Sequence, residues 1–423
     1  MLHINIIQEN IESVVNKLKV KNFHAKELIV KITDLDKTRR QTQNLLDKNL
    51  AEAKIVAKEI GGLFKKGLAV EANKFKEKSV ELKKISKELS ETLEKAKTDI
   101  HKLLIQIPNI PHPSVPPGKS DQDNELVAEE GTIPDLPENA LPHWELAAKY
   151  DIIDFDLGSK ITGAGFPVYK GKGARLQRAL INFFLDEALK NNYLEIQPPL
   201  LVNEASAYGT GQLPDKDEQM YHVGLDNFYL IPTSEVPVTN IYRDVILNYK
   251  DLPVKNVAYS NCFRREAGSY GKDVRGLNRL HQFDKVEIVQ IQHPEVSYET
   301  LEEMSNYVAS LIRNLNLPFR TLILCGGDLS FTSAKTYDFE VFSAAQKRWL
   351  EVSSVSNFEN YQANRLKLRF KNSDGKTKTA HTLNGSALAL PRIVAALLEN
   401  NQTEEGIKIP EVLVKYTGFD LIN

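Results

Sequence analysis

Two stretches in the first hundred residues place apolar side chains at alternating steps of three and four, and this pattern most restricts how the chain can fold. Polar residues interrupt both seams, and Gly61, Gly62 and Gly67 separate them. The first seam comprises Leu28, Ile32, Leu35, Arg39, Thr42, Leu46, Asn49, Ala53, Val56 and Ile60, and the second comprises Phe75, Lys78, Leu82, Ile85, Leu89, Thr92, Ala96, Asp99 and Leu103. We predict an antiparallel hairpin of two helices, each roughly 50 Å long at about 1.5 Å per residue. A dimerising coiled coil remains an alternative.

The charge of this region differs from that of the whole chain. Residues 26–102 contain 19 Lys and Arg against 13 Asp and Glu, whereas the full chain has a net charge of −2. A local positive surplus favours a polyanionic partner for the hairpin. Two solvated helices without such a partner would carry the same charges, and we expect Lys65 and Lys66 at the turn to be solvated.

A proline-rich segment divides the chain. Residues 107–120 read IPNIPHPSVPPGKS, which suits neither a helix nor a central strand. We therefore predict a helical domain over 1–106, a linker over 107–120 and a second domain over 121–423. The GKS ending imitates a phosphate-binding loop, but Pro113 stands where the first glycine of that motif belongs.

The second domain alternates strand-like and helical patterns. An amphipathic helix is expected at about 174–190, followed by an extended segment that stops at Pro198 and Pro199. Further expected elements are a strand over 228–238, a helix over 298–314, strands over 318–327 and 349–358, and a strand, a turn at Gly385 and a helix over 380–400. Pro391 should bend or delay that helix. The fold class is therefore α+β, with a mainly antiparallel sheet flanked by helices.

Residues 259–290 are typical of a strand hairpin that binds a nucleotide. Strands over 257–263 and 280–290 flank a loop that carries Gly268, Gly271, Lys272, Arg275, Gly276 and Arg279. Arg264, Arg265 and Glu266 follow the first strand, where an arginine can fork onto a phosphate, and Phe283 offers a flat face to a base. A surface hairpin with solvated charges is the open alternative.

Composition excludes several classes of protein. The chain is 42% hydrophobic and 26% charged, an ordinary globular balance, and it holds no apolar run of membrane-spanning length. Its two cysteines, Cys262 and Cys325, belong to no spaced Cys/His set. We therefore expect a cytoplasmic protein without a membrane anchor and without zinc.

Three pieces of the second domain occur in the order of the signature motifs of class II aminoacyl-tRNA synthetases. These are the helix and strand that end at Pro199, the hairpin containing FRREAGSYGKDVRGLNRLHQF, and the segment NGSALALPRIVAALLEN. The whole chain resembles the bacterial-type seryl-tRNA synthetase family, including TSE at 233–235, GDLSFTSAKTYDFEVF and EVSSVSNF. The resemblance implies the class II fold with an N-terminal helical arm that binds tRNA.

The resemblance also implies site residues. Catalysis would depend on Arg264 at the α-phosphate of ATP and the serine carboxylate, and on Arg392 at the γ-phosphate. ATP would be contacted by Arg264, Arg265, Glu266, Leu280, Phe283, Glu351, Val352, Ser353, Ser354 and Arg392, and L-serine by Thr233, Ser234, Glu235, Arg264, Glu287, Asn384 and Ser386. Glu351 and Ser354 would hold Mg²⁺. A structural salt bridge remains an alternative for Glu351, and turn or capping chemistry around Gly385 remains one for Asn384 and Ser386.

The activity implied by the resemblance is that of a homodimeric serine–tRNA ligase, which charges tRNA(Ser) and, where the host has it, tRNA(Sec). Two rivals stay open: a ligase with the same core that charges a carrier protein, and a catalytically inactive RNA-binding paralogue. Relatives of the first kind usually lack a long arm. A threonine-specific synthetase is disfavoured because the expected Cys/His zinc set is absent from the sequence.

Overall fold

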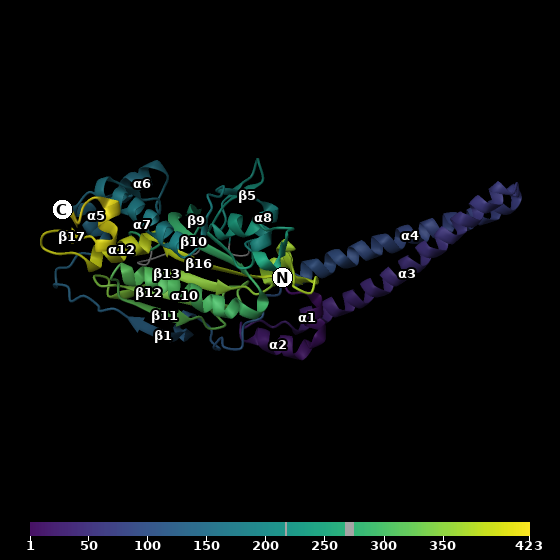
Figure 1. Ribbon diagram of the computed structural model, residues 1–423, viewed down its shortest axis with the longest axis horizontal. Coiled ribbons are helices and arrows are strands. Elements are labelled where there is room, and N and C mark those ends of the chain that lie inside the picture. The colour runs from purple at the N-terminus through teal and green to yellow at the C-terminus, as the bar shows by residue number, and fades with distance from the viewer. Residues whose placement is uncertain (216–217, 267–274) are drawn as a thin grey trace. The chain divides into compact units, whose positions relative to one another are not determined.

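The computed structural model describes residues 1–215, 218–266 and 275–423, so the predicted loop residues Gly268, Gly271 and Lys272 lie outside the described part. The chain forms two compact units (Figure 1). The first comprises residues 1–19 and 23–108, and the second comprises residues 20–22 and 109–423.

The first unit is helical. It contains α1 (Ile4–Glu9), α2 (Ile11–Lys19), α3 (Lys26–Lys65) and α4 (Ala69–Leu104). The 40 residues of α3 and the 36 of α4 correspond to lengths of about 60 and 54 Å. The two helices run side by side as the predicted hairpin, which we call the arm (Figure 1). Gly61 and Gly62 are helical, contrary to expectation, and the turn instead lies at residues 66–68, where Gly67 has φ +76°.

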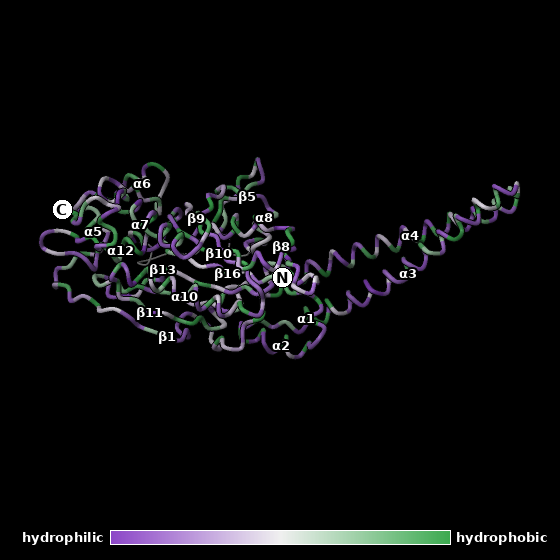
Figure 2. Tube along the Cα trace, viewed as in Figure 1, coloured by the Kyte–Doolittle hydropathy of each residue, from purple (hydrophilic) through white to green (hydrophobic). Residues whose placement is uncertain are grey.

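On α3 the predicted seam positions Ile32, Thr42, Leu46, Asn49 and Val56 are buried, whereas the buried seam of α4 differs in phase from the predicted one. On α4 the buried residues include Leu93 and Ile100, whereas Thr92 is exposed and Asp99 is only half-buried. The prediction followed three-then-four steps after Leu82, but four-then-three steps place the larger apolar groups inside, which is energetically favoured. Figure 2 shows apolar and polar residues alternating along both helices.

The second unit is built on an eight-stranded sheet. In spatial order its strands are β1 (Glu125–Glu130), β11 (Phe319–Ile323), β12 (Lys335–Ser343), β13 (Arg348–Asn357), β16 (His381–Ala389), β10 (Gln282–Gln292), β9 (Val254–Phe263) and β4 (Leu194–Glu195). Neighbouring strands are antiparallel except for β4 and β9. Together with the helical hairpin, this sheet confirms the predicted α+β class.

Shorter elements complete the second unit. The small sheets consist of β2 (Ile153–Asp154) with β3 (Val168–Tyr169); β5 (Leu201–Asn203), β6 (His222–Val223) and β7 (Phe228–Leu230); β8 (Ile246–Asn248), β14 (Arg369–Lys371) and β15 (Thr377–Thr379); and β17 (Ile407–Lys408) with β18 (Leu421–Ile422). The α-helices are α5 (His143–Lys149), α6 (Phe155–Ile161), α7 (Gly171–Lys190), α8 (Glu204–Thr210), α9 (Glu235–Asn240), α10 (Ser297–Asn314), α11 (Tyr361–Leu366), α12 (Leu390–Asn400) and α13 (Glu411–Thr417).

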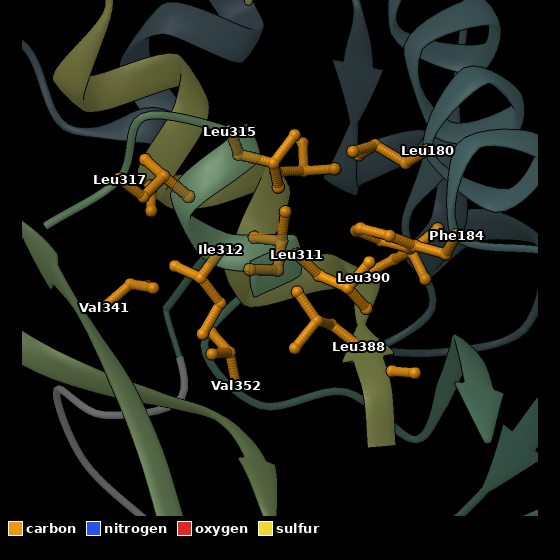
Figure 3. Packing of buried hydrophobic residues seen from close by; sticks show 14 of the residues in the cluster. Leu180, Phe184, Leu311, Ile312, Leu315, Leu317, Val341, Val352, Leu388 and Leu390 are labelled. Carbon is orange, nitrogen blue, oxygen red and sulfur yellow. The ribbon is translucent and has the colours of Figure 1, made fainter. Parts of the chain in front are cut away.

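One face of the large sheet packs against helices to form the core. Leu311 and Ile312 of α10 belong to one buried cluster with Phe184 of α7 and Leu390 of α12 (Figure 3). Most strands of the sheet contribute residues to the same cluster, such as the alternate residues Val286 and Ile288 of β10. Since successive strand side chains point to opposite faces, the residues between them point away from this core.

Three local expectations were wrong. The segment expected as a strand over 228–238 is strand only in β7, and α9 begins at Glu235, because Pro237 falls in the first helical turn, where its missing N–H costs nothing. Gly385 lies inside β16 rather than in a turn, and a Cβ there would lie 3.0 Å from Cγ2 of Val355 on β13. Pro391 occupies the second position of α12, within the first turn, where its missing N–H costs no helical hydrogen bond. In addition, β1 and β12 had not been expected as strands.

No helix among the described residues combines the length and the apolar character that a membrane crossing requires.

Replacing Leu93 by alanine should destabilise the arm by about 2–3 kcal/mol, because it leaves a cavity in the seam. Thr92→Ala, one position away on the exposed side, is the matched control and should change stability by less than about 0.5 kcal/mol. Hydrogen–deuterium exchange of the α3 and α4 amides in the full-length chain measures both effects. Equal exchange in the two variants would contradict the observed seam.

Candidate functional site

The face of the large sheet opposite the core carries polar side chains. Directly paired residues on neighbouring strands share a face. Glu287 of β10 pairs with Ser386 of β16, Asn384 of β16 pairs with Ser356 of β13, and Lys285 of β10 pairs with Ser260 of β9. Strand alternation therefore brings together Phe283, Glu287, Asn384 and Ser386, four of the residues singled out in the sequence.

A β-bulge brings Glu351 and Ser354 to this same face. Residues three apart on a regular strand point to opposite faces. The register between β12 and β13 shifts after Phe339, so that Ser354 pairs with Asp338 while Glu351 pairs with Glu340. An extra residue in one strand re-aims the side chains beyond it. The Ser354 hydroxyl consequently lies 3.4 Å from Oε1 of Glu351.

Three of the predicted nucleotide contacts have their side chains in the core. Val352 and Leu280 belong to the buried apolar cluster. The buried Ser353 hydroxyl donates a hydrogen bond to the main-chain oxygen of Ser386 at 2.6 Å. A ligand on the polar face can meet these three residues only through their main chains.

The residues that follow β9 lie against aromatic rings and carbonyl groups. Nε of Arg264 donates to the Pro232 carbonyl at 3.4 Å, and its guanidinium lies 5.2 Å from the centre of the Phe283 ring. Arg265 is placed similarly: Nε donates to the Met220 carbonyl at 3.0 Å, and the guanidinium lies 5.0 Å from the centre of the Tyr221 ring. Glu266, with φ +52°, has Oε2 3.2 Å from Nη1 of Arg279.

Arg392 lies in the first turn of α12, beside Glu351. Its Nη1 donates to the main-chain oxygen of Glu351 at 2.7 Å and lies 3.7 Å from the carboxylate. Its Nε donates to the main-chain oxygen of Asn278 at 3.0 Å. The guanidinium is therefore fixed between β13 and the chain that returns from the hairpin loop.

A cluster of buried polar side chains, which we call the pocket, lies at the start of α9. Thr233, Ser234 and Glu235 are all at most 8% exposed. The Ser234 hydroxyl is 2.5 Å from the Ser260 hydroxyl, and Ser234 is therefore bound within the fold. The hydroxyl of Ser386 donates to Oε2 of Glu287 at 3.3 Å. Thr233, Glu235, Glu287, Asn384 and Ser386 thus converge, since Asn384 also hydrogen-bonds to Glu235.

Two pocket residues had not been singled out in the sequence. Nζ of Lys285 lies 2.6 Å from Oε2 of Glu287 and donates to Oγ1 of Thr233 at 2.8 Å. Nε2 of Gln362, on α11, donates to Oε1 of Glu235 at 2.6 Å. Lys285 could have been found, because it precedes Glu287 by two residues on a strand and must share its face. No local pattern pointed to Gln362, whose place depends on the tertiary fold.

The pocket raises the pKa of Glu235. Burial is the largest cause, and the charge of Glu287 adds to it, while Gln362, Lys285 and Asn384 partly offset both. The resulting pKa is about 7. A carboxyl with such a raised pKa loses its proton at neutral pH most readily when a cation binds beside it.

The acidic groups beside Arg392 suit a hard cation. Asp338 is 9% exposed, and its Oδ1 is buried without a hydrogen-bond partner among the described residues. Burial and the neighbouring Glu351 raise the pKa of the Asp338 carboxyl well above its usual range. Among those residues no group of three His, Cys, Asp or Glu side chains is arranged to hold a metal ion. A cation here would therefore need further oxygen ligands from a substrate.

Two known families match separate parts of the chain. Residues 1–111 match the seryl-tRNA synthetase N-terminal domain, and residues 221–401 match the tRNA synthetase class II core domain (G, H, P, S and T).

Similar proteins match over the full length. A serine–tRNA ligase of Salinibacter ruber is 49% identical and covers 99% of this chain and 98% of its own. The serine–tRNA ligase of Akkermansia muciniphila is 45% identical and covers 100% and 99%. Among solved structures, the seryl-tRNA synthetase of Pyrococcus horikoshii in complex with ATP is similar, with a TM-score of 0.92, 35% identity and coverage of 100% and 99%. These matches support neither a ligase that charges a carrier protein nor a catalytically inactive RNA-binding paralogue.

Glu235→Gln should stabilise the ligand-free protein at pH 8. Between the unfolded pKa near 4.5 and the folded pKa of about 7, the folded state binds more protons, so the free energy of unfolding falls as pH rises. The variant lacks this loss, which amounts to about 3 kcal/mol at most. Calorimetric melting at pH 5 and pH 8 measures it, with the exposed Glu404→Gln as control. A stability difference that does not grow with pH would contradict the raised pKa.

Proposed function

The chain belongs to the seryl-tRNA synthetase family of class II aminoacyl-tRNA synthetases, and from this premise we propose how its residues divide the reaction. The enzyme is a serine–tRNA ligase. A carboxylate oxygen of serine attacks the α-phosphorus of ATP, the bond to the β-phosphate breaks, and pyrophosphate leaves. A terminal ribose hydroxyl of tRNA then attacks the seryl carbonyl, and AMP leaves. The convergence of Glu235, Glu287 and Lys285 beside Arg264 and Phe283 is the observation that carries the residue assignment.

We propose that two arginines hold the triphosphate. Arg264 would contact the α-phosphate and the serine carboxylate, and Arg392 would contact the γ-phosphate. Each already has its Nε engaged by a main-chain oxygen, of Pro232 and of Asn278 respectively, which fixes the aim of the guanidinium. A guanidinium fixed in this way can offer its remaining edge to phosphate oxygens in a forked contact. Charge that develops on phosphorus oxygens is then stabilised without reorganisation.

The adenine ring would lie between Phe283 and Glu266. Phe283 is partly exposed at the start of β10 and offers a ring for stacking. Glu266 would accept a hydrogen bond from the adenine amino group. Its present partner Arg279, with Nη1 at 3.2 Å from Oε2, holds the carboxylate in place. Arg265, with Leu280, Val352 and Ser353 through their main chains, would line the rest of the nucleotide site.

The buried pocket would bind serine. Glu235 and Thr233 would meet the ammonium group, because a cation that leaves water needs a carboxylate. Ser234 would support this loop through its bond to Ser260. Glu287, Asn384 and Ser386 would surround the side-chain hydroxyl. Lys285 forms an ion pair with Glu287 at 2.6 Å, so Glu235 is the pocket carboxyl that would pair with the incoming ammonium group. Alanine would leave buried polar groups unpaired and would be rejected strongly.

Magnesium fits the oxygens on β13. Glu351 and Ser354 share a face and lie 3.4 Å apart, and hard oxygen ligands of this kind suit Mg²⁺. A magnesium ion held there with ATP would supply positive charge beside the triphosphate. In this arrangement the carboxylate of Glu351, the hydroxyl of Ser354 and phosphate oxygens would share the coordination. Arg392, which bonds the main chain of Glu351, would keep this strand end aligned with the triphosphate.

The remaining parts of the proposal concern partners. The helical region, residues 1–106, would bind tRNA(Ser) with its positive surplus, followed by the linker 107–120 and the catalytic domain 121–423. The same recognition would extend to tRNA(Sec) in a host that has it. Leu194 on the edge strand β4 and Leu201 on β5 are 62% and 43% exposed, and their exposed apolar surface supports a homodimer. The reaction would occur in the cytoplasm, where its three substrates are found.

Arg264→Ala should lower serine-dependent ATP–pyrophosphate exchange by about 10²–10³-fold, the loss typical when a group that stabilises developing charge is removed. The exposed Arg369→Ala on β14 is the matched control and should retain normal exchange. Near-normal exchange by Arg264→Ala would refute its assigned role.

The kcat/KM for serine should depend on the ionisation of Glu235. This ratio reports groups of the free enzyme, and the pKa of Glu235 is about 7. Below that pH the carboxyl is neutral and cannot pair with the ammonium group, so we expect kcat/KM to fall by about tenfold per pH unit. Pyrophosphate exchange between pH 5.5 and 8.5 measures the profile, and a flat profile would exclude Glu235 as the ammonium partner.

A further inference from the structure

A buried histidine–glutamate pair lies outside the substrate contacts proposed above. His143 begins α5, Glu399 lies on α12, and both are fully buried. Nδ1 of His143 is 2.7 Å from Oε1 of Glu399, which also accepts the main-chain N–H of His143 at 3.0 Å. Burial alone would raise the pKa of the Glu399 carboxyl, but hydrogen bonds from His143 and Ser343 outweigh it and lower that pKa. Glu399 is therefore ionised at neutral pH.

The hydrogen bond to Nε2 of His143 determines that the ring proton lies on Nδ1. The main-chain N–H of Leu277 donates to Nε2 at 2.8 Å, so Nε2 must be an unprotonated acceptor. The proton of the neutral ring consequently lies on Nδ1 and points at Glu399. At Gly276, with φ +68°, a Cβ would lie 2.2 Å from Nε2, and only glycine permits this approach.

Leu277 and Asn278 connect this pair to Arg392. The carbonyl of Asn278 accepts Nε of Arg392 at 3.0 Å, and the Asn278 side-chain amide donates to Oε1 of Gln346 at 3.0 Å. Gln346 in turn donates to Oε1 of Glu399 at 3.0 Å. Arg392 and Glu399 are seven residues apart on α12 and therefore lie on the same side of that helix. Helix α12 thus holds residues 277–278 directly through Arg392. It also holds them indirectly through Glu399, which bonds to His143 and Gln346.

We propose that His143, Glu399 and Gln346 are positioning residues that fix the returning limb of the hairpin loop and so aim Arg392 at the triphosphate. The inference rests on the proposed role of Arg392 in ATP binding. If residues 277–278 shifted, the Asn278 carbonyl would no longer fix Nε of Arg392. A purely structural pair would affect stability without a preference for one substrate. A positioning pair should affect the KM for ATP and leave the KM for serine unchanged.

Two substitutions of His143 separate its two hydrogen bonds. His143→Asn places an amide near the Nδ1 position, so it keeps the bond to Glu399 but cannot reach Leu277. His143→Gln places an amide oxygen near the Nε2 position, so it keeps the acceptor for Leu277. In pyrophosphate exchange, His143→Asn should raise the KM for ATP by about tenfold, the effect of losing one buried hydrogen bond. The Gln variant should restore most of that affinity, and the KM for serine should stay within about twofold in both.

Gln346→Met gives an independent test at a partly exposed position, where loss of folding is not expected. It removes the partner of the Asn278 side chain and should also raise the KM for ATP. Unchanged KM values for ATP in the Asn and Met variants, measured well below their melting temperatures, would overturn the inference. Arg392→Ala, measured in parallel, separates this failure from another: if it too leaves the KM for ATP unchanged, the proposed role of Arg392 is itself wrong.

Discussion

The candidate site depends on the strict alternation of side chains along the central strands. Val286 and Ile288 of β10 are buried in the core, which forces Phe283, Lys285 and Glu287 to the opposite face. A slip of one residue would exchange the two sets and would bury charged groups among helices. The same packing that stabilises the fold therefore fixes the polar face. The bulge in β13 departs from this alternation and adds Glu351 and Ser354 to that face, and the pairing of β10 with β16 also shifts register between Lys285 and Glu287.

The polar face also carries an electrostatic cost. Glu235 and Glu287 are both buried, while Lys285 pairs with only one of them. The raised pKa of Glu235 expresses this imbalance, since a second buried carboxylate without a cation is unfavourable. In the proposed site, the ammonium group of the substrate would supply the missing charge. Substrate binding and the reduced stability of the ligand-free protein would then have the same cause, the buried carboxyl of Glu235.

Sequence patterns predicted the helical hairpin and the strands β9 and β10, whereas Glu287, Asn384 and Ser386 were expected as site residues only from the family resemblance. Sequence patterns failed where tertiary packing decides the outcome. In the sequence, Gly385 indicates a turn. In the structure it lies in a strand, where the absence of a side chain lets Val355 of the neighbouring strand approach closely. The bulge at Val352 has no signature in a single sequence. That Glu351 and Ser354 share one face of the sheet could therefore not be derived from the alternation of residues along the strand. Gln362 and Glu399 lie on helices whose patterns indicate only burial, and their partners are distant in sequence.

The positions of the two arginines follow from the sheet rather than from loops. Arg264 directly follows β9, and Arg392 lies three residues beyond the end of β16, with β10 between these two strands. Strands held in one hydrogen-bonded sheet keep their ends at fixed separations, whereas loop residues would have to be ordered at each binding event. Each Nε is in addition bonded to a main-chain oxygen, so the side chains keep their directions as well as their positions. A nucleotide that bridges the two guanidinium groups, as we propose, would therefore meet a preorganised pair, and its binding energy would be available for bending the triphosphate.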